Sequence, residues 1–295
     1  MNPPGLSVVL PASTSATSQV LDLSSPIVMG VLNVTPDSFS DGGHYRELDR
    51  ALQRAAEMQA DGAAIIDVGG ESTRPGAPAV SEQEELDRVI PVIEAIRKEL
   101  SVPISIDTSK PGVMREAAMA GATMINDVCA LQLDGALQTA AELQLPVCLM
   151  HMQGDPRTMQ ASPSYKDVVS EVSQFLGDRV AECMAAGLSR DLLLVDPGFG
   201  FGKTPEQNME LLANLSECLK IGCPVLIGVS RKSTIGLVTG RDVDDRLAGG
   251  LAAAVAAVLQ GASIVRTHDV METVDAVKVA SCILNNGKLP KDERA

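Results

Sequence analysis

The chain has 295 residues, which is long for one ordinary domain, although a barrel of repeated strand–helix units commonly reaches ~250 residues as one body. Its formal net charge of -14 argues against nonspecific binding to nucleic acids or anionic membranes, because both would repel such a surface. Aromatic residues make up only 2% of the chain and Trp is absent, so aliphatic side chains and Met must build the core.

Polar, irregular margins are predicted at residues 1–25 and 286–295, outside the folded body, and the first of them is placed to cap the floor of a barrel. The start lacks Lys and Arg, and Pro11 interrupts its short apolar run, so we expect no signal peptide. No apolar run reaches the ~18 residues that suggest a membrane span. Six cysteines without C-x-x-C spacing indicate reduced thiols, and together these features predict a cytoplasmic protein.

One junction recurs along the chain. In each copy an Ala-rich helical stretch ends at Gly and leads into a short apolar run. Copies lie at residues 59–70, 118–128, 184–198 and 259–270. Their glycines (Gly62, Gly121, Gly187 and Gly261) stand where a left-handed helix cap belongs, since Gly has no Cβ to clash there. The apolar runs are too short for helices and too continuous for one-sided strands, which indicates buried parallel strands alternating with helices.

Eight such strands can be counted in chain order. They lie near residues 27–33, 63–68, 103–107, 123–127, 146–151, 192–196, 224–229 and 263–267. Eight regular units without a break in composition predict an α/β fold, a single-domain (β/α)8 TIM barrel over residues 26–285. An open doubly wound sheet is the alternative architecture.

Polar residues follow nearly every predicted strand. They are Asn33, Asp67, Asp107, Asn126, Asp127, His151, Asp196, Ser230, Arg231, Lys232, Arg266 and His268. In a barrel the carboxyl ends of all strands meet at one opening, so these side chains should converge there. Helix capping explains any one Asp or Asn equally well, but it does not explain the accompanying cations Arg74, Lys232, Arg266 and His268.

Acidic side chains at such an opening need donors or cations, because burying a bare carboxylate is costly. The 2-amino and N3–H edge of a pterin offers two parallel donors, which match Asp196 with Asn126 and Asp107 around the ring. Lys232 could then donate to the ring carbonyl or N5. The opposite charges on the rim indicate a polar ligand with an anionic part.

Two long loops, 33–43 and 69–78, are rich in Pro, Gly and Ser and are predicted to be mobile lids, with plain solvated turns as the alternative. The string DPGFGFGKT (196–204) is not a phosphate loop, because Pro197 takes the place of a required Gly; its glycines instead let the backbone pass beside a flat ligand. A Schiff-base role for Lys232 is less favoured, since Arg231 and an anionic substrate would compete for the site.

The three histidines fit no zinc site, and His151 is as well explained by the core as by ligand contact. His268 is better placed for an anion. A Mg2+ ion carried in by a diphosphate, with Asn33 as one protein oxygen ligand, fits hard-cation chemistry.

Long motifs in unbroken order over about residues 22–285 resemble those of the dihydropteroate synthase family. The strings are MGVLNVTPDSFSDGG (29–43), DVGGESTRPGA (67–77), SIDTSKP (105–111), INDV (125–128), LMHMQGDPRTMQ (149–160), DPGFGFGKT (196–204), GVSRKS (228–233) and RTHDV (266–270). The resemblance implies a dimeric (β/α)8 enzyme of folate synthesis that joins p-aminobenzoate to a pterin methyl diphosphate and is inhibited by sulfonamides.

The resemblance also implies residue roles, carried over position by position. The pterin places are taken by Asp107, Asn126, Asp196 and Lys232, with Asp67 and Met150 lining the pocket. The diphosphate and Mg2+ places are taken by Asn33, Arg266 and His268, with Thr73 and Arg74 beside the reacting ends. Phe39, Pro75 and Ser233 match the surroundings of p-aminobenzoate and of sulfonamides. The residues expected to carry the chemistry are Arg74, Asp107, Asp196, Lys232, Arg266 and His268.

The implied reaction loses pyrophosphate to give a pterin methylene cation, which the aniline nitrogen attacks. Two other readings of the same barrel are a pterin-binding methyltransferase module that works with a corrinoid partner, and a noncatalytic pterin-binding subunit. Neither gives a reason to keep the diphosphate cations and both lid motifs.

Overall fold

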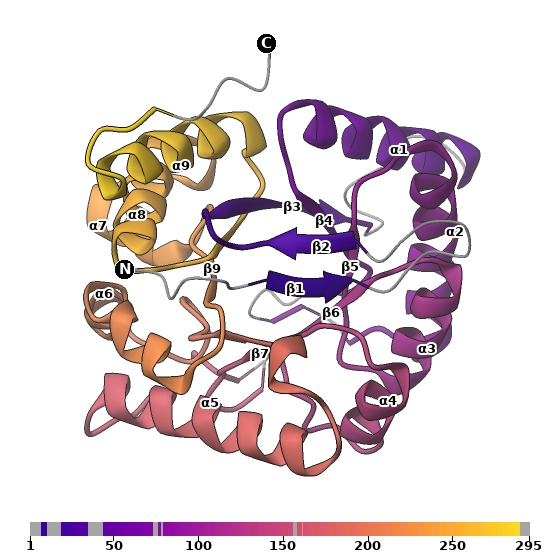
Figure 1. Ribbon diagram of the computed structural model, residues 1–295, viewed down its shortest axis with the longest axis horizontal. Coiled ribbons are helices and arrows are strands. Elements are labelled where there is room, and N and C mark those ends of the chain that lie inside the picture. The colour runs from indigo at the N-terminus through magenta and orange to yellow at the C-terminus, as the bar shows by residue number, and fades with distance from the viewer. Residues whose placement is uncertain are drawn as a thin grey trace.

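The protein forms a (β/α)8 barrel with an added hairpin in the computed structural model, which describes residues 7–10, 19–34, 44–72, 76–77, 79–155, 158–160 and 162–289 (Figure 1). The strands are β1 (Ser7–Leu10), β2 (Gln19–Asp22), β3 (Ile27–Asn33), β4 (Ile65–Gly69), β5 (Ile104–Asp107), β6 (Met124–Asp127), β7 (Val147–Met150), β8 (Leu193–Asp196), β9 (Leu226–Gly228) and β10 (Ile264–Thr267). The α-helices are α1 (His44–Ala60), α2 (Glu82–Glu99), α3 (Pro111–Ala120), α4 (Ala136–Leu143), α5 (Val168–Ala185), α6 (Pro205–Ala213), α7 (Ser233–Thr239), α8 (Leu247–Leu259) and α9 (Val270–Leu284).

The eight strands β3–β10 pair in parallel, in the order β8-β7-β6-β5-β4-β3-β10-β9. A parallel bridge between Val195 and Val225 then joins β8 to the segment that leads into β9, so the two edges of the sheet meet. The predicted barrel is confirmed, the open sheet is wrong, and each of the eight strands begins and ends within two residues of its predicted place.

The glycines of the recurring junction have the predicted left-handed backbone. Gly121, after α3, has φ 122° and donates its N–H to the carbonyls of Ala117 and Ala118. Gly62, Gly187 and Gly261 have φ near 100° in the equivalent places. A residue with a Cβ would be strained at each of these positions, which explains why the sequence shows Gly at every copy.

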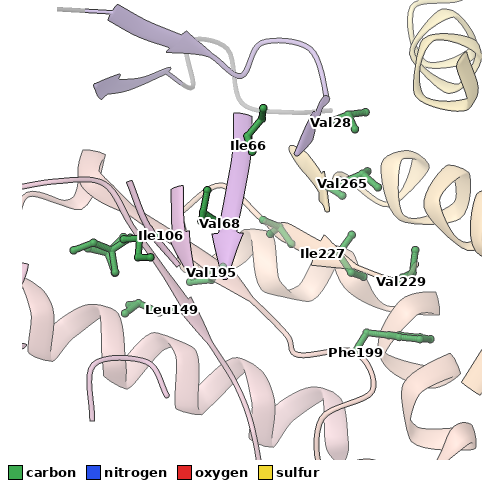
Figure 2. Packing of buried hydrophobic residues seen from close by; sticks show 14 of the residues in the cluster. Val28, Ile66, Val68, Ile106, Leu149, Val195, Phe199, Ile227, Val229 and Val265 are labelled. Carbon is green, nitrogen blue, oxygen red and sulfur yellow. The ribbon is translucent and has the colours of Figure 1, made fainter. Parts of the chain in front are cut away.

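Alternate side chains of each strand pack into two separate hydrophobic cores, one outside the barrel and one inside it. Side chains that point outward, such as Ile66, Val68, Ile106, Leu149 and Val195, pack against the surrounding helices in one large cluster (Figure 2). Side chains that point inward form a second, smaller cluster at the amino ends of the strands. Its strand members are Met29, Ile65, Met124, Cys148, Leu194, Leu226 and Ile264.

A hairpin closes this lower end of the barrel. β1 and β2 pair antiparallel and cross the barrel in Figure 1, and Leu21 and Leu23 belong to the inner cluster. The expectation of an irregular segment at 1–25 is therefore wrong for 7–10 and 19–22. The domain boundaries at 25/26 and 285/286 stay predictions. No helix among the residues described is long and apolar enough to cross a membrane.

We expect Leu23→Ala to destabilise the protein by about 2–5 kcal/mol, because Leu23 is fully buried and its truncation leaves a cavity in the barrel floor. Leu289→Ala, at a position that is 80% exposed, is the matched control and should change stability by less than about 0.5 kcal/mol. Urea unfolding followed by circular dichroism measures both. Equal urea midpoints for the two variants would contradict a contribution of Leu23 to the stability of the barrel.

Candidate active site

The polar rim lies one layer above the apolar floor, because residues two apart in a strand face the same side. Five rim residues stand two positions after a member of the inner apolar cluster in the same strand. The pairs are Ile65 and Asp67, Met124 and Asn126, Cys148 and Met150, Leu194 and Asp196, and Ile264 and Arg266. The predicted convergence of these residues on one opening thus follows from strand periodicity and parallel pairing.

Arg266 ties together carboxylates from two other strands. Its Nε donates to Asp67 Oδ2 at 2.6 Å, and its Nη2 donates to Asp107 Oδ2 at 2.7 Å. Asn126 Nδ2 adds a third donor to the group at 3.0 Å from Asp67 Oδ2. The structure therefore brings four sequence-predicted residues into one hydrogen-bonded network around the lumen.

This network leaves acceptors unused. Asp67 is fully buried, and its Oδ1 has no hydrogen-bond partner among the described residues. Burial raises the pKa of Asp107 to about 7, although the Arg266 guanidinium opposes the shift. A buried acceptor without a donor is costly, so this side of the rim favours a ligand that brings N–H groups.

Asp196 faces the same opening from the other side of the barrel. Its Oδ1 accepts the N–H of Gly198 at 2.7 Å, and burial raises its pKa to about 6. Met150 lies beside it in register on β7. The Nζ of Lys232 lies 3.8 Å from the centre of the Phe201 ring, and burial lowers the pKa of Lys232 to about 8.

His268 and Ser230 form the third part of the rim. His268 Nδ1 lies 3.1 Å from Ser230 Oγ, and the Ser230 hydroxyl also accepts the backbone N–H of His268 at 3.3 Å. Burial, with the Arg266 charge next in size, lowers the pKa of His268 to about 4. A pKa of about 4 makes His268 neutral at pH 7, whereas the sequence analysis counted it among the cations.

The remaining predicted residues are placed less centrally or not described. Asn33 ends β3, and Ser233 begins α7 directly after Lys232 with its side chain exposed. Phe39, Thr73, Arg74 and Pro75 lie outside the described residues, as do most of loop 33–43 and the centre of loop 69–78. Their assigned roles stay predictions.

Acidic, histidine and cysteine side chains do not cluster as a metal site within the described ranges. The oxygen ligand predicted from the sequence is the Asn33 carboxamide, at the end of β3. One oxygen ligand does not hold a resident metal, but it fits a hard cation whose other ligands are phosphate oxygens and water.

Sequence reasoning missed several contributors. Phe201 and Lys203 lie in the glycine-rich segment, where the sequence predicted only a backbone path beside a flat ligand and no role for these two side chains. Their position directly after a strand end was the available signal. Lys110 was missed as well, and it forms ion pairs with Glu71 and with the buried Glu85.

Beside the rim, a cavity of about 240 Å³ opens between the second loop and the loops that follow β5 and β6. Asp107 lines it together with Glu71, Lys110, Cys129 and Val80. Glu71 also accepts the backbone N–H of Val80 at 3.2 Å, so Lys110 and Glu71 tie the two ends of the second loop to the barrel.

Comparison with known proteins gives a consistent result. The family model described as "Pterin binding enzyme" matches residues 29–268. The dihydropteroate synthase of Haemophilus influenzae is 54% identical over 270 residues, which are 92% of this chain and 98% of that protein. A crystal structure of Yersinia pestis dihydropteroate synthase with a sulfonamide drug complex superposes with TM-score 0.86 at 53% identity, covering 90% of this chain and 97% of that one. The Xanthomonas albilineans enzyme in complex with 7,8-dihydropteroate gives TM-score 0.82 at 46% identity, covering 90% and 96%.

Proposed function

Because the chain belongs to the dihydropteroate synthase family, we propose that its barrel mouth joins p-aminobenzoate to (7,8-dihydropterin-6-yl)methyl diphosphate and releases pyrophosphate. The protein is a transferase of folate synthesis that forms 7,8-dihydropteroate. The observation that carries the residue assignment is the network in which Arg266 joins Asp67 and Asp107 beside Asp196.

The acidic side of the rim suits the pterin. Asp67 Oδ1 lacks a donor, and Asp196 uses its Oδ1 for one backbone N–H, which leaves lone pairs for the 2-amino and N3–H groups. Asp107 and Asn126 complete the ring of polar contacts, and Met150 supplies an apolar wall. Lys232, already stacked on Phe201, would donate to the ring carbonyl or N5.

The diphosphate would bind on the side of Arg266 and His268. A guanidinium has five N–H donors, and the carboxylates use two of those of Arg266, so others remain for phosphate oxygens. His268 would act as a neutral hydrogen-bond donor. Asn33 would hold Mg2+ carried by the diphosphate, and the ion would supply further charge stabilisation to the leaving group.

Chemistry at this mouth needs no covalent nucleophile. The bond between the pterin methylene and the diphosphate breaks, Arg266 and His268 stabilise the charge that develops on the leaving oxygens, and the carboxylates of Asp107 and Asp196 offset the positive charge on the pterin. The aniline nitrogen then attacks the methylene and loses a proton. Thr73 and Arg74 are proposed to lie beside the reacting ends and to bind the diphosphate. Phe39, Pro75 and Ser233 are proposed to line the p-aminobenzoate end, where a sulfonamide would compete as an analogue.

A cytoplasmic location is also proposed. It is supported by six cysteines that are all free thiols, most of them buried, which suits a reducing compartment.

Mixing p-aminobenzoate and the pterin diphosphate with Mg2+ should release pyrophosphate, measured with a coupled phosphate assay. We expect Asp196→Ala to lower turnover by at least about a hundredfold, because the pterin loses its main acceptor. Asp191→Ala, on the exposed turn before β8, is the matched control and should be unaffected. A corrinoid methyltransferase or a noncatalytic subunit would release no pyrophosphate, and an active Asp196→Ala variant would remove the pterin assignment.

Pterin binding should depend on pH through Asp196, whose pKa is raised to about 6. The carboxylate form accepts the ring N–H donors, so protonation below pH 6 should weaken the affinity for a 6-substituted pterin by about tenfold per pH unit. Isothermal titration calorimetry between pH 5 and 7 measures this. Asp107, whose pKa is raised to about 7, titrates in the same range, so Asp196→Asn should bind weakly and keep only the slope that comes from Asp107. A wild-type profile no steeper than that of Asp196→Asn would contradict the role of the Asp196 carboxylate.

We further propose a homodimer formed through α7, α8 and α9, which pack side by side (Figure 1). Large apolar side chains on these three helices are exposed: Leu237, Val238, Leu247, Met271, Val279 and Ile283. Exposed apolar side chains on neighbouring helices are typical of a subunit interface.

Light scattering should therefore give twice the chain mass of 30.9 kDa. Val279 and Ile283 are four residues apart on α9 and share one helix face, so the double change Val279→Glu with Ile283→Glu should give monomers. Met119→Glu changes an equally exposed apolar residue on α3 and should leave the dimer intact. A monomeric wild-type protein at micromolar concentration would refute the proposed dimer.

A further inference from the structure

Lys203 ends the glycine-rich segment that follows β8, and its ammonium group is enclosed by the protein. The residue is 2% exposed. Its Nζ donates to the carbonyls of Gly198 and Phe201, both at 2.9 Å, and lies 3.4 Å from the carbonyl of His151. His151 Nδ1 is also 3.0 Å away, and burial keeps His151 neutral by lowering its pKa to about 3. Burial lowers the pKa of Lys203 itself to about 7, and the hydrogens on its Nζ point at protein acceptors.

The segment gripped by Lys203 carries two groups of the pterin side. Gly198 turns its N–H to Asp196 while its carbonyl accepts from Lys203. A Cβ at Gly198 would lie 1.9 Å from the His151 carbonyl oxygen, so the two backbones touch here. Phe201 presents its ring to Lys232 while its own carbonyl is held by Lys203.

A second anchor fixes the same segment from outside. Asn208 Oδ1 accepts the N–H of Gly200 at 2.7 Å, and Asn208 Nδ2 lies 3.1 Å from Thr234 Oγ1 at the start of α7. Gly200 in turn lies against Lys232, since a Cβ there would be 3.0 Å from Lys232 Cδ. A shift of residues 198–203 toward α7 would therefore displace the Lys232 side chain.

We propose that Lys203 is a positioning residue for pterin recognition: its buried Nζ gathers carbonyls of residues 151, 198 and 201, which aims the Gly198 N–H at Asp196 and sets the Phe201 ring under Lys232. This inference rests on the proposed function. Lys203 is not itself a catalytic residue, because its Nζ is enclosed and its donors are used within the protein.

The test is Lys203→Met, which roughly keeps the length of the side chain and removes its hydrogen-bonding amino group. Calorimetry should show the affinity for pterin-6-carboxylate falling at least about tenfold, while the affinity for pyrophosphate with Mg2+ changes less than about twofold, since that ligand would use Arg266 and His268 on the other side of the rim. Ile96→Ala, fully buried in the last turn of α2, is the control for lost stability, and should leave both affinities unchanged at a temperature well below its melting point.

Unchanged pterin affinity in Lys203→Met, or an equal loss for both ligands, would overturn the proposal. Should that variant fail to fold, Lys203→Gln keeps two donors, and hydrogen exchange at the Gly198 amide should speed up in it. Exchange at the Thr123 amide, which lies at the amino end of β6 and donates to the carbonyl of Ile104, should not change. An unchanged Gly198 rate there would equally overturn it. A wild-type protein that binds no pterin would instead refute the proposed function.

Discussion

The ion pairs of Arg266 with Asp67 and Asp107 are the interaction on which the barrel mouth depends. A carboxylate that is fully buried, as Asp67 is, would cost several kcal/mol without a cation and donors beside it. Arg266 reaches two strands on the far side of β3 because parallel pairing keeps the inward-facing residues of β10, β4 and β5 close together in the lumen. The guanidinium therefore allows an acidic rim to exist before any ligand binds.

That rim is preorganised for two unlike ligand parts. The acids have unused lone pairs, as Asp67 Oδ1 shows, while Arg266 has N–H groups beyond those the acids occupy. A donor-rich ring and an anion can thus bind to the same network at neighbouring points. The ring and the anion can therefore bind while the ion pairs of Arg266 stay intact. Because these charged groups are already in place, they need little rearrangement when charge separates in the reaction.

The sequence predicted the eight strands and the ring of polar residues because both follow from local rules: apolar runs after Gly caps, and polar residues where strands end. It did not predict that Arg266 pairs with Asp67, since the two are 199 positions apart and a strand-end pattern says nothing about partners. The neutral state of His268 depends on burial, which a sequence does not display. The role of Lys203 depends on three backbone carbonyls that only the folded chain brings together, so its motif did not reveal it. The hairpin of β1 and β2 is too short to show a clear period.

Neutral His268 has a consequence for the anionic end. Its low pKa comes first from burial, which an arriving ligand does not relieve, and then from the charge of Arg266. A diphosphate would therefore meet a neutral imidazole that can donate one N–H, while Arg266 carries the positive charge on this side of the rim. The cation thus stays on the residue that two carboxylates already hold in place, and the leaving oxygens gain charge beside a guanidinium whose position is fixed.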